Sequence, residues 1–408
     1  MEILIPHSSD DGWRAHLRRM GNLYPQQPFA TESINFIGAF SKAVLTDSSM
    51  RSFPELMALA HWMRKAHILE IKDRFNAECG DGVFLPRGIA LHFAPSSVDS
   101  MFVYSWFLSL LMGNLNIVRL STRRGDQLTQ LIATLNSILA RPEFAAVRER
   151  SLVVSFEHDD AITQALSARC QIRVLWGGDQ AITRLRQVPL PPLATEVVFA
   201  DRFSFSAMKA AAVLEQDEAG FHQLIRNFFT DSFWFDQMAC SSPRMVVWIG
   251  TPVDIAEAKQ RFWPALKAYV AEQKVQYPAA VGITRLTTLY TYAAGGEVDA
   301  ILSSPMEVPA RAHLNSDATR FRDSHSGSGM FLEQECEGLR ELLRLIEPKD
   351  QTMSAFGFKR SELQEFAREL PKRAIDRIVE LGKSINFSRV WDGVDLLRVF
   401  SRQIEIAI

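Results

Sequence analysis

The sequence predicts an α/β protein with two domains. Short apolar runs alternate with longer segments in which apolar residues recur every three or four positions. This alternation is typical of parallel strands joined by helices. A chain of 408 residues is long enough for two such domains. Its local composition changes near residue 190, where prolines cluster.

The first domain is expected to begin with helices and to continue as alternating strands and helices. Residues 30–78 have a helical apolar pattern, which the segment CGDG at 79–82 ends. Helical segments such as 100–112 separate the expected strands, which are GIALHFAP (88–95), NIVRLS (116–121), SLVVSF (151–156) and IRVLWGG (172–178).

The second domain is expected to repeat the alternation. A helical region at 208–229 precedes the strand RMVVWIG (244–250), and the amphipathic helix AEAKQRFWPALKAYVAEQ (256–273) follows it. The segment FRDSHSGSG (321–329) is predicted to be a flexible loop, because it is rich in glycine and serine.

The charge and composition are those of an ordinary soluble enzyme. The formal net charge is −2, and 47% of the residues are hydrophobic and 23% charged. Basic and acidic residues are mixed throughout, which gives no support for a nucleic-acid partner or an anionic membrane.

The cysteines and the N-terminus indicate a cytoplasmic protein. The apolar segment 101–113 is too short to span a bilayer and is predicted to be a buried helix. The N-terminal residues lack a signal-peptide pattern. No disulfide framework or metal site is expected, because the four cysteines are far apart and form no CxxC pair: Cys79, Cys170, Cys240 and Cys336.

Cys240 is the candidate nucleophile in the segment DQMACSSP (236–243). Most cysteines that form no disulfide are small buried residues, and that interpretation remains open. Its polar flanks, however, predict a loop between a helix and a strand, where α/β enzymes often place catalytic groups. A thiolate there needs a lowered pKa.

The glycine pair Gly177-Gly178 is a candidate phosphate-binding turn. It follows an expected strand and precedes a helix, and the N-terminus of a helix attracts phosphate. The GxGxxG fingerprint of dinucleotide-binding domains is absent, and an ordinary turn explains the pair equally well.

An ordered series of motifs resembles the acyl-CoA reductases of bacterial luminescence (LuxC type), a branch of the aldehyde dehydrogenase superfamily. The resemblance covers the chain from about residue 80 to its end. Its motifs are HFAPSSV (92–98), GNLNIVRLS (113–121), VLWGGDQAI (174–182), DQMACSSP (236–243), EPKDQT (347–352) and RIVELGKSINFSRVWDGVDLLRVFSRQIEI (377–406).

The resemblance implies an aldehyde dehydrogenase-like fold with two Rossmann-like α/β domains. Residues 1–205 would bind the nucleotide, with a helical region at their N-terminal end. Residues 206–385 would form the catalytic domain that carries the cysteine. Residues 386–408 would return to the first domain or to an oligomer interface.

The resemblance also implies a reaction and its residues. The enzyme would reduce a fatty acyl thioester to an aldehyde with NADPH, or with NADH, through an acyl-enzyme on Cys240. Arg119 would lie beside the adenosine ribose, and Ser121 belongs to the same element. Gly177 and Gly178 would form the turn near the pyrophosphate and nicotinamide. An aldehyde-oxidising enzyme and a non-catalytic subunit that binds an acyl-transferring partner are the alternatives.

Two departures from the superfamily pattern concern the reaction centre. The position nearest to the oxyanion-hole asparagine is Ser97, whose hydroxyl can donate one hydrogen bond. Phe199 occupies about the place of the glutamate that activates water in hydrolytic members, and a phenyl ring cannot act as a base. The acyl-enzyme would then resist hydrolysis, unless Asp201 or Glu196 supplies the base instead.

The expected partners follow from the same resemblance. The acyl group would arrive as acyl-CoA or from a partner acyl-protein synthetase, and the chain would form a homo-oligomer.

Overall fold

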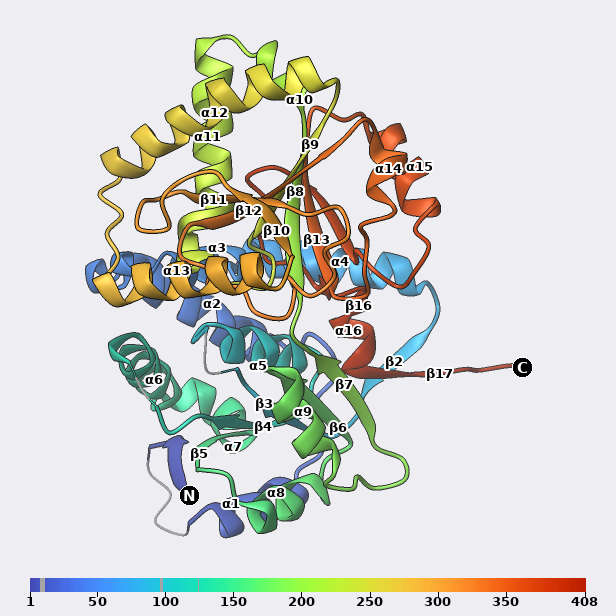
Figure 1. The fold of residues 1–408 in the computed structure, drawn as a ribbon. Helices are drawn as coiled ribbons and strands as arrows, with labels where there is room; N and C mark the ends of the chain where they lie inside the picture. Colours follow the sequence, from blue (N-terminus) through green and yellow to red (C-terminus); the bar gives the residue numbers. More distant parts are fainter. Residues whose placement is uncertain (8–11, 96–97, 124) are drawn as a thin grey trace. The chain divides into compact units, whose positions relative to one another are not determined.

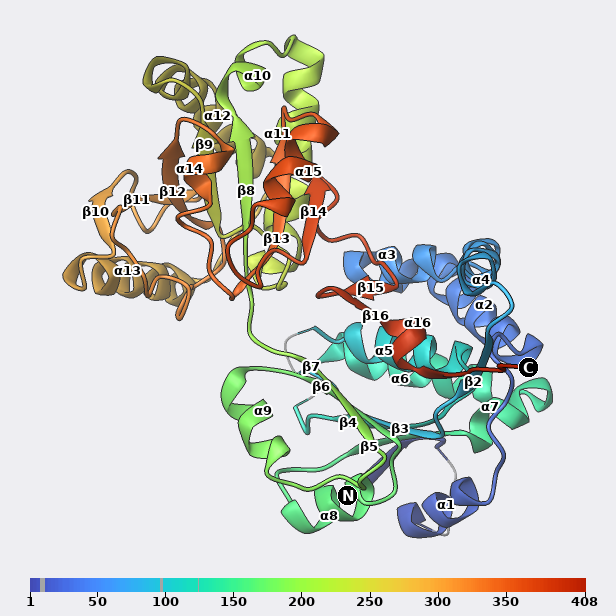
Figure 2. The same cartoon turned by 90° about the vertical axis from the view of Figure 1, so that its right-hand side faces the viewer.

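The computed structural model describes residues 1–7, 12–95, 98–123 and 125–408. The chain divides into two compact units, which are residues 1–201 with 387–408 and residues 202–386 (Figures 1 and 2). Each unit contains one large, mostly parallel sheet with helices around it, as the alternation of apolar patterns predicts.

The first unit is built on a six-stranded sheet. Its strands lie in the order β1 (Glu2–Ile5), β5 (Ser151–Ser155), β4 (Leu115–Leu120), β3 (Ile89–Phe93), β6 (Ile172–Trp176) and β7 (Thr195–Phe199). All neighbours are parallel except β1, which pairs antiparallel with β5. The chain runs outward from β3 to β4 and β5 and then returns to β6 on the other side of β3. The strand order therefore reverses between β3 and β6, and α/β folds bind their ligands at such a switch point.

Helices surround this sheet and one of them is wholly buried. Every residue of α5 (Met101–Leu111) is buried, as its apolar composition predicts. None of the helices in the described ranges combines the length and apolarity needed to cross a bilayer. The other helices of the unit are α1 (Gly12–Gly21), α2 (Thr31–Thr46), η1 (Ser48–Ser52), α3 (Pro54–Trp62), α4 (Lys65–Cys79), α6 (Asp126–Leu139), η2 (Pro142–Phe144), α7 (Ala145–Glu149), α8 (Asp160–Ser167), α9 (Asp179–Arg186) and α16 (Leu396–Val399).

The C-terminal residues 387–408 belong to the first unit. They contain a short hairpin of β15 (Val390–Trp391) and β16 (Val394–Asp395). After α16, strand β17 (Ser401–Ile404) pairs antiparallel with β2 (Val83–Pro86), and the chain ends beyond this two-stranded sheet (Figure 2).

The second unit is built on a seven-stranded sheet. Its strands lie in the order β10 (Val298–Ile301), β11 (Ala310–Leu314), β12 (Met330–Cys336), β9 (Met245–Ile249), β8 (Phe203–Lys209), β13 (Asp350–Phe356) and β14 (Arg377–Glu380). Only β10 is antiparallel to its neighbour. The helices are α10 (Ala210–Leu214), α11 (Glu218–Phe233), η3 (Trp234–Gln237), α12 (Pro252–Glu272), α13 (Ala279–Ala294), α14 (Leu339–Leu342) and α15 (Arg360–Arg368).

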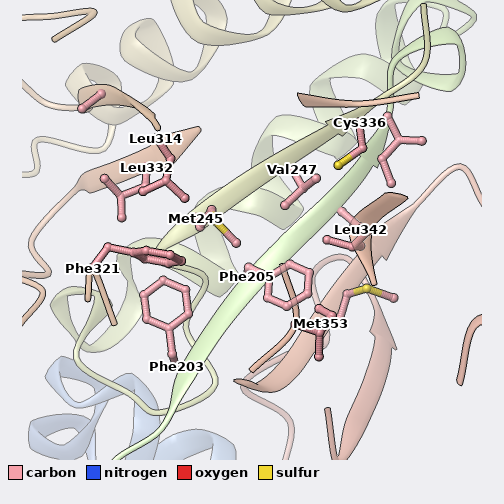
Figure 3. Packing of buried hydrophobic residues seen from close by; sticks show 14 of the residues in the cluster. Phe203, Phe205, Met245, Val247, Leu314, Phe321, Leu332, Cys336, Leu342 and Met353 are labelled. Atoms are coloured by element: carbon pink, nitrogen blue, oxygen red, sulfur yellow. The ribbon is translucent and has the colours of Figure 1, made fainter. Parts of the chain in front are cut away.

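Both faces of this second sheet are apolar, which fixes the strands in register. Met245 and Val247 of β9 pack on one face with Phe203, Phe205 and Leu332 (Figure 3). The alternate residues, Val246 and Trp248, pack on the other face against α11 and α12. Since successive side chains of a strand point to opposite faces, a shift by one residue would exchange the two cores. The start of β9, just after Cys240, is thus held in place.

Candidate active site

Cys240 lies on the loop that joins η3 to β9 in the second unit. The residue is half-buried, and none of the four cysteines forms a disulfide. The sequence predicted this placement of Cys240 on a loop between a helix and a strand. The loop reaches the sheet at the amino ends of β8 and β9, which are parallel neighbours.

Three consecutive residues just before this loop have a left-handed backbone. Their φ angles are 59° at Phe235, 52° at Asp236 and 62° at Gln237. This conformation costs a residue with a Cβ atom about 1–2 kcal/mol. It persists only where the surroundings fix it, and such residues cluster at functional sites. The local backbone therefore marks the Cys240 segment independently of the cysteine.

The side chain of Gln237 is fully buried and makes four hydrogen bonds to the backbone. Its Nε2 donates to the carbonyl oxygens of Pro243 and Met330, both at 2.8 Å. Its Oε1 accepts from the N–H groups of Gly329 and Met330 at 2.9 and 3.1 Å. The amide thus satisfies both N–H donors and both oxygen lone pairs.

The loop opposite Cys240, residues 325–330, fits closely against the left-handed turn. The N–H of Ser328 donates to the carbonyl of Asp236 at 2.7 Å. A Cβ atom on Gly327, whose φ is +64°, would lie 2.6 Å from the sulfur of Met238 and 3.0 Å from the Asp236 carbonyl. Only glycine fits there, because both the backbone angle and the space exclude a side chain. The sequence had suggested flexibility for this segment, whereas in the structure it braces the cysteine loop.

The main chain of Cys240 is held by Ser204, at the amino end of β8. The Ser204 hydroxyl donates to the Cys240 carbonyl at 2.6 Å and accepts from the N–H of Thr352 at 3.2 Å. The N–H of Arg244 donates to the Ser204 carbonyl at 2.9 Å. Ser204 therefore fixes the backbone of the cysteine to two neighbouring strands.

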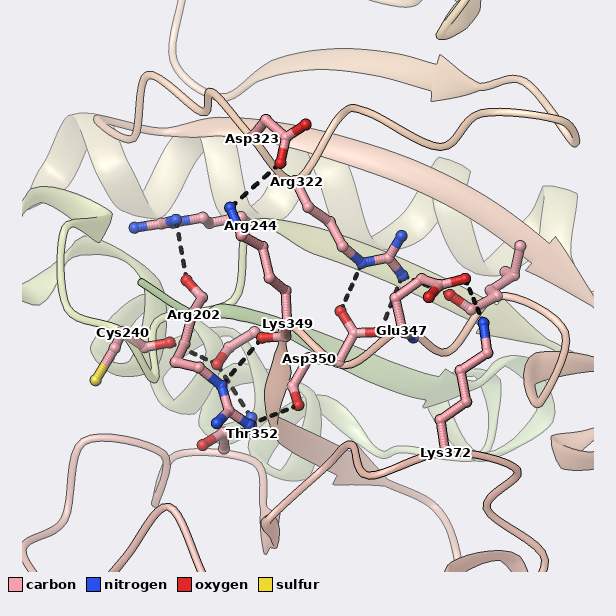
Figure 4. Close-up of polar contacts among 12 residues, drawn as sticks. Arg202, Cys240, Arg244, Arg322, Asp323, Glu347, Lys349, Asp350, Thr352 and Lys372 are labelled. Carbon is pink, nitrogen blue, oxygen red and sulfur yellow. Dashed lines mark hydrogen bonds and ion pairs between the residues drawn. The ribbon is translucent and has the colours of Figure 1, made fainter. Parts of the chain in front are cut away.

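Charged side chains near this loop are largely paired (Figure 4). Arg202 contacts Asp376 at 2.6 Å. Arg322 makes a bidentate pair with the buried Asp350, at 2.7 and 2.9 Å. Burial and the nearby Arg244 hold the pKa of His325 well below its usual range, so this imidazole is neutral. These pairs make the surroundings of Cys240 rigid as well as polar.

The aromatic segment 228–235, which precedes the turn, is mainly core. Phe228 and Phe233 are buried against the sheet, where they contact Phe331. From the sequence, this cluster just before Cys240 was the better candidate for an acyl tunnel, although helical spacing favoured plain core for most of the aromatic residues. Phe228 and Phe233 pack in the core instead.

Gly177 and Gly178 lie at the switch point of the first unit. They follow β6 directly, and Gly178 is the N-cap residue of α9. A Cβ atom on Gly178 would meet nothing within 4 Å, and one on Gly177 only Ala181, at 3.9 Å. The turn is therefore open on the side where these side chains would point, and it presents backbone N–H groups at a helix N-terminus. Such a turn fits a pyrophosphate.

Arg119 and Ser121 lie at the carboxyl end of β4, two strands away from β6 in the same sheet. The Arg119 guanidinium donates to the Phe156 carbonyl at 2.9 Å and lies over the Phe156 ring. Burial lowers the pKa of Arg119. The Ser121 hydroxyl accepts from the N–H of Arg123 at 3.3 Å. Arg119, Ser121 and the glycine turn thus share one edge of the sheet, whereas Cys240 belongs to the other unit. Ser97, the expected oxyanion donor, lies outside the described residues.

Phe199 ends β7, and its ring stacks on Trp176. The ring centroids are 3.9 Å apart and the planes are tilted by 18°. Glu196, one alternative base, is engaged by Arg173 at 2.8 Å and by Arg186 at 2.9 Å. The N–H of Asp201, the other alternative, donates to the Asp179 carboxylate at 3.2 Å. The ion pairs of Glu196 make it a poor candidate for activating water.

Sequence reasoning missed a buried polar network beneath the switch point. His92 on β3 contacts the Ser105 hydroxyl at 2.8 Å and the Asn116 amide oxygen at 3.1 Å. Trp176 donates to the same hydroxyl at 3.2 Å. Burial lowers the pKa of His92 to about 4, so the ring is neutral. The sequence pattern of GIALHFAP (88–95) predicted a strand but gave no signal for this network, in which all five residues of β3, including His92, are buried.

No group of three or more His, Cys, Asp or Glu side chains that could hold a metal ion occurs in the described part of the chain.

A family model described as acyl-CoA reductase (LuxC) matches residues 51–284, which is more than half of the chain. The chain belongs to this family. The resemblance found in the motifs is thereby confirmed at the level of the family.

One relative is a long-chain acyl-protein thioester reductase from Aliivibrio fischeri, 23% identical over 318 residues. The matched region is 76% of this chain and 62% of the relative, so the chain spans less than two thirds of that protein.

Solved structures of aldehyde dehydrogenases share the fold. Methylmalonate-semialdehyde dehydrogenase from Oceanimonas doudoroffii has a TM-score of 0.67 at 9% identity, over 96% of this chain and 89% of that one. Glyceraldehyde-3-phosphate dehydrogenase GapN from Methanocaldococcus jannaschii, complexed with NADP, has a TM-score of 0.65 at 9% identity, over 96% and 91%. A 1-pyrroline-5-carboxylate dehydrogenase from Thermus with bound NAD has a TM-score of 0.63 at 12% identity, over 96% and 83%. The predicted fold class is therefore confirmed.

Proposed function

We propose that the chain reduces a fatty acyl thioester to an aldehyde through an acyl-enzyme on Cys240. The observation that carries this proposal is the fixed backbone of Cys240, which follows a left-handed turn and is anchored by Ser204. A nucleophile that is held in one geometry reacts faster, because less conformational entropy is lost when the reacting atoms meet. Family membership supplies the class of reaction.

The Cys240 thiolate would attack the carbonyl carbon of the acyl thioester. The carbonyl electrons move to oxygen, and when they return the sulfur of the donor leaves with the original bond pair. The product of this half-reaction is a thioester on Cys240. Ser97 is proposed as one donor to the transient oxyanion, through its hydroxyl.

A nicotinamide cofactor, when bound, supplies the hydride that turns this thioester into an aldehyde and frees the Cys240 thiolate. We assign its pyrophosphate to the turn Gly177-Gly178, whose missing side chains leave room at the N-terminus of α9. Arg119 and Ser121, on the same edge of the sheet, would hold the adenosine ribose. A guanidinium pairs well with a phosphate, so Arg119 favours NADPH over NADH. The balanced reaction consumes acyl-CoA, NADPH and a proton, and it yields aldehyde, CoA and NADP⁺.

The reductive outcome is supported by Phe199. This residue offers only carbon atoms, and its ring is stacked on Trp176. If Phe199 takes the place of the water-activating glutamate, as the resemblance implies, it supplies no base, so water would attack slowly and the acyl group would remain available for reduction.

The acyl donor would be acyl-CoA or an acyl group from a partner acyl-protein synthetase. A protein-bound acyl donor agrees with the name of the Aliivibrio fischeri relative, a long-chain acyl-protein thioester reductase. We further propose a homo-oligomer, in which residues 386–408 contribute either to the first domain or to the subunit interface, and a cytoplasmic location.

An assay of NADPH oxidation with acyl-CoA substrates from C2 to C16 tests the function. Wild-type protein should form aldehyde and release CoA in equal amounts. Cys240→Ala should lose at least a thousandfold in rate, whereas Cys79→Ala, which alters a half-buried cysteine of the first unit, should retain it. Aldehyde formation by the Cys240 variant near the wild-type rate would refute the assignment. Acid formation from aldehyde and NADP⁺ alone would favour an aldehyde dehydrogenase.

A further inference from the structure

We infer that Gln237 is a positioning residue that sets the location and reactivity of the Cys240 thiol. The inference rests on the proposed role of Cys240. It concerns the segment from the left-handed turn to the start of β9, which lies wholly within the second unit.

The site at position 237 is specific for a glutamine amide. Two donors and two acceptor positions are used at once, and all four partners are backbone groups. A glutamate keeps the acceptors but loses the donors, and it places a carboxylate against two carbonyl oxygens. An asparagine is one methylene shorter, and a methionine has the right length but no donor and only a weakly accepting sulfur. The environment therefore selects for both the length and the chemistry of this side chain.

The four bonds close the loop that carries the cysteine. One partner, the carbonyl of Pro243, lies at the far end of this loop, so the side chain of Gln237, the residue just before the loop, ties its two ends together. The other partners, Gly329 and Met330, lie where the opposite loop enters β12. Ser204 holds the Cys240 carbonyl between these ends. A side chain that served only to fill the core would have no reason to bond to its own loop in this way.

The left-handed turn gives these bonds a consequence for the thiol. Residues with a Cβ atom leave the left-handed region when nothing holds them there. Gln237 is the last of three such residues, and Cys240 follows it closely. If the amide is removed, the turn can relax toward right-handed angles and carry Cys240 with it. Removing the amide should then change the reactivity of the Cys240 thiol in addition to lowering the stability of the protein.

Gln237→Met tests the inference, with Gln334→Met as its matched control. Gln334 is also a buried glutamine of the second unit, on β12, but its bonds go to Leu314 and Glu335 rather than to the cysteine loop. Two readouts are needed, namely the pH profile of Cys240 alkylation by iodoacetamide, followed by mass spectrometry, and the separate kcat and KM for an acyl-CoA. For Gln237→Met we expect kcat to fall at least tenfold with KM changed less than threefold, and the midpoint of the alkylation profile to move to higher pH. The control should match wild type in both.

Gln237→Glu provides a second variant. When protonated, its carboxyl regains one donor, so its kcat relative to wild type should rise as the pH falls from 8 to 6. The inference is overturned if both Gln237 variants keep the wild-type alkylation profile, if their kcat falls no more than that of Gln334→Met, or if neither folds. These outcomes can be distinguished from a wrong assignment of Cys240 as the nucleophile. In that case Cys240→Ala would keep its activity, while Gln237→Met would still alter alkylation at Cys240.

Discussion

Asp231 accepts a hydrogen bond from the backbone N–H of Gly382 at 2.7 Å. The carboxylate lies on α11, the helix that leads to the cysteine segment, and it also accepts the N–H of Ser384 at 3.0 Å. The side chain is fully buried. Burial raises its pKa to about 6, from an ordinary value of 3.8, although the N–H groups act in the opposite direction. One buried carboxyl thus ties α11 to the turn that follows β14.

Asp231→Asn should remove a pH dependence of stability. The folded protein holds the Asp231 proton more tightly than the unfolded chain, because the pKa is higher when folded. Its stabilising contribution is complete below about pH 4 and is lost as the pH rises through about 6. A difference of ~2 pKa units corresponds to about 3 kcal/mol. Urea unfolding from pH 4.5 to 7.5 should show the variant gaining up to that amount relative to wild type, and a difference that stays constant with pH would contradict the assignment.

Asp350→Asn should destabilise the second unit by about 3–5 kcal/mol, because it leaves the buried Arg322 without its counter-charge. Arg322 and Asp350 are 5% and 0% exposed as side chains. The control is Lys372→Ala, which breaks the exposed pair with Glu347 (Figure 4). It should cost at most about 1 kcal/mol. Equal losses of unfolding free energy in the two variants would show that burial does not govern the Arg322–Asp350 pair.

Gly327→Ala should displace the left-handed turn. The added methyl group meets the sulfur of Met238 and the carbonyl of Asp236, and the backbone angle already disfavours it. We expect a loss of about 1–3 kcal/mol in unfolding free energy and a change in the rate of Cys240 alkylation. Gly338→Ala serves as the control, since its φ is −161° and no atom lies within 4 Å of the new methyl group. Wild-type alkylation in Gly327→Ala would mean that the two loops move independently.

The sequence allowed the strands and the general site to be predicted because these depend on local patterns. The apolar runs at β3 to β6 and at β9 end within one or two residues of their predicted limits. Strand β1 was missed, since its pairing joins Glu2 to Ser155 and no local pattern reports that contact. The same reason hid Gln237, whose partner Met330 lies 93 residues further along the chain. Ser204 and Thr352, 148 residues apart, are a third case. The only local signal was a polar glutamine beside an apolar strand.

Arg119→Ala should raise the KM for NADPH at least tenfold and that for NADH less than threefold. The guanidinium uses one of its donors on the Phe156 carbonyl and keeps others for a phosphate. Arg119→Lys separates charge from shape, since lysine retains the charge but cannot make the planar contact. Initial rates at saturating acyl-CoA give both constants. Equal increases in KM for the two cofactors would show that Arg119 does not bind the 2′-phosphate.

The acyl-enzyme on Cys240 should be long-lived until a reduced cofactor arrives. Hydrolysis needs a base within about 2.6–3.2 Å of an attacking water. Phe199 cannot be that base, and Glu196 is held by two arginines. Protein acylated with a labelled acyl-CoA and freed of excess donor should lose its label slowly alone. NADPH should release it as aldehyde within seconds.

The variant Phe199→Glu tests the same idea by placing a carboxylate where the Phe199 ring lies. Phe199→Glu offers a base, but the side chain is only 4% exposed and lies against Trp176. Burial would raise the pKa of the new carboxyl and keep part of it protonated near neutral pH. Release of free acid by this variant should therefore increase with pH from 6 to 9, while wild type shows no such increase. Rapid loss of label as free acid from the wild-type protein without NADPH would instead indicate a hydrolytic enzyme whose base lies elsewhere, with Asp201 as the first residue to replace.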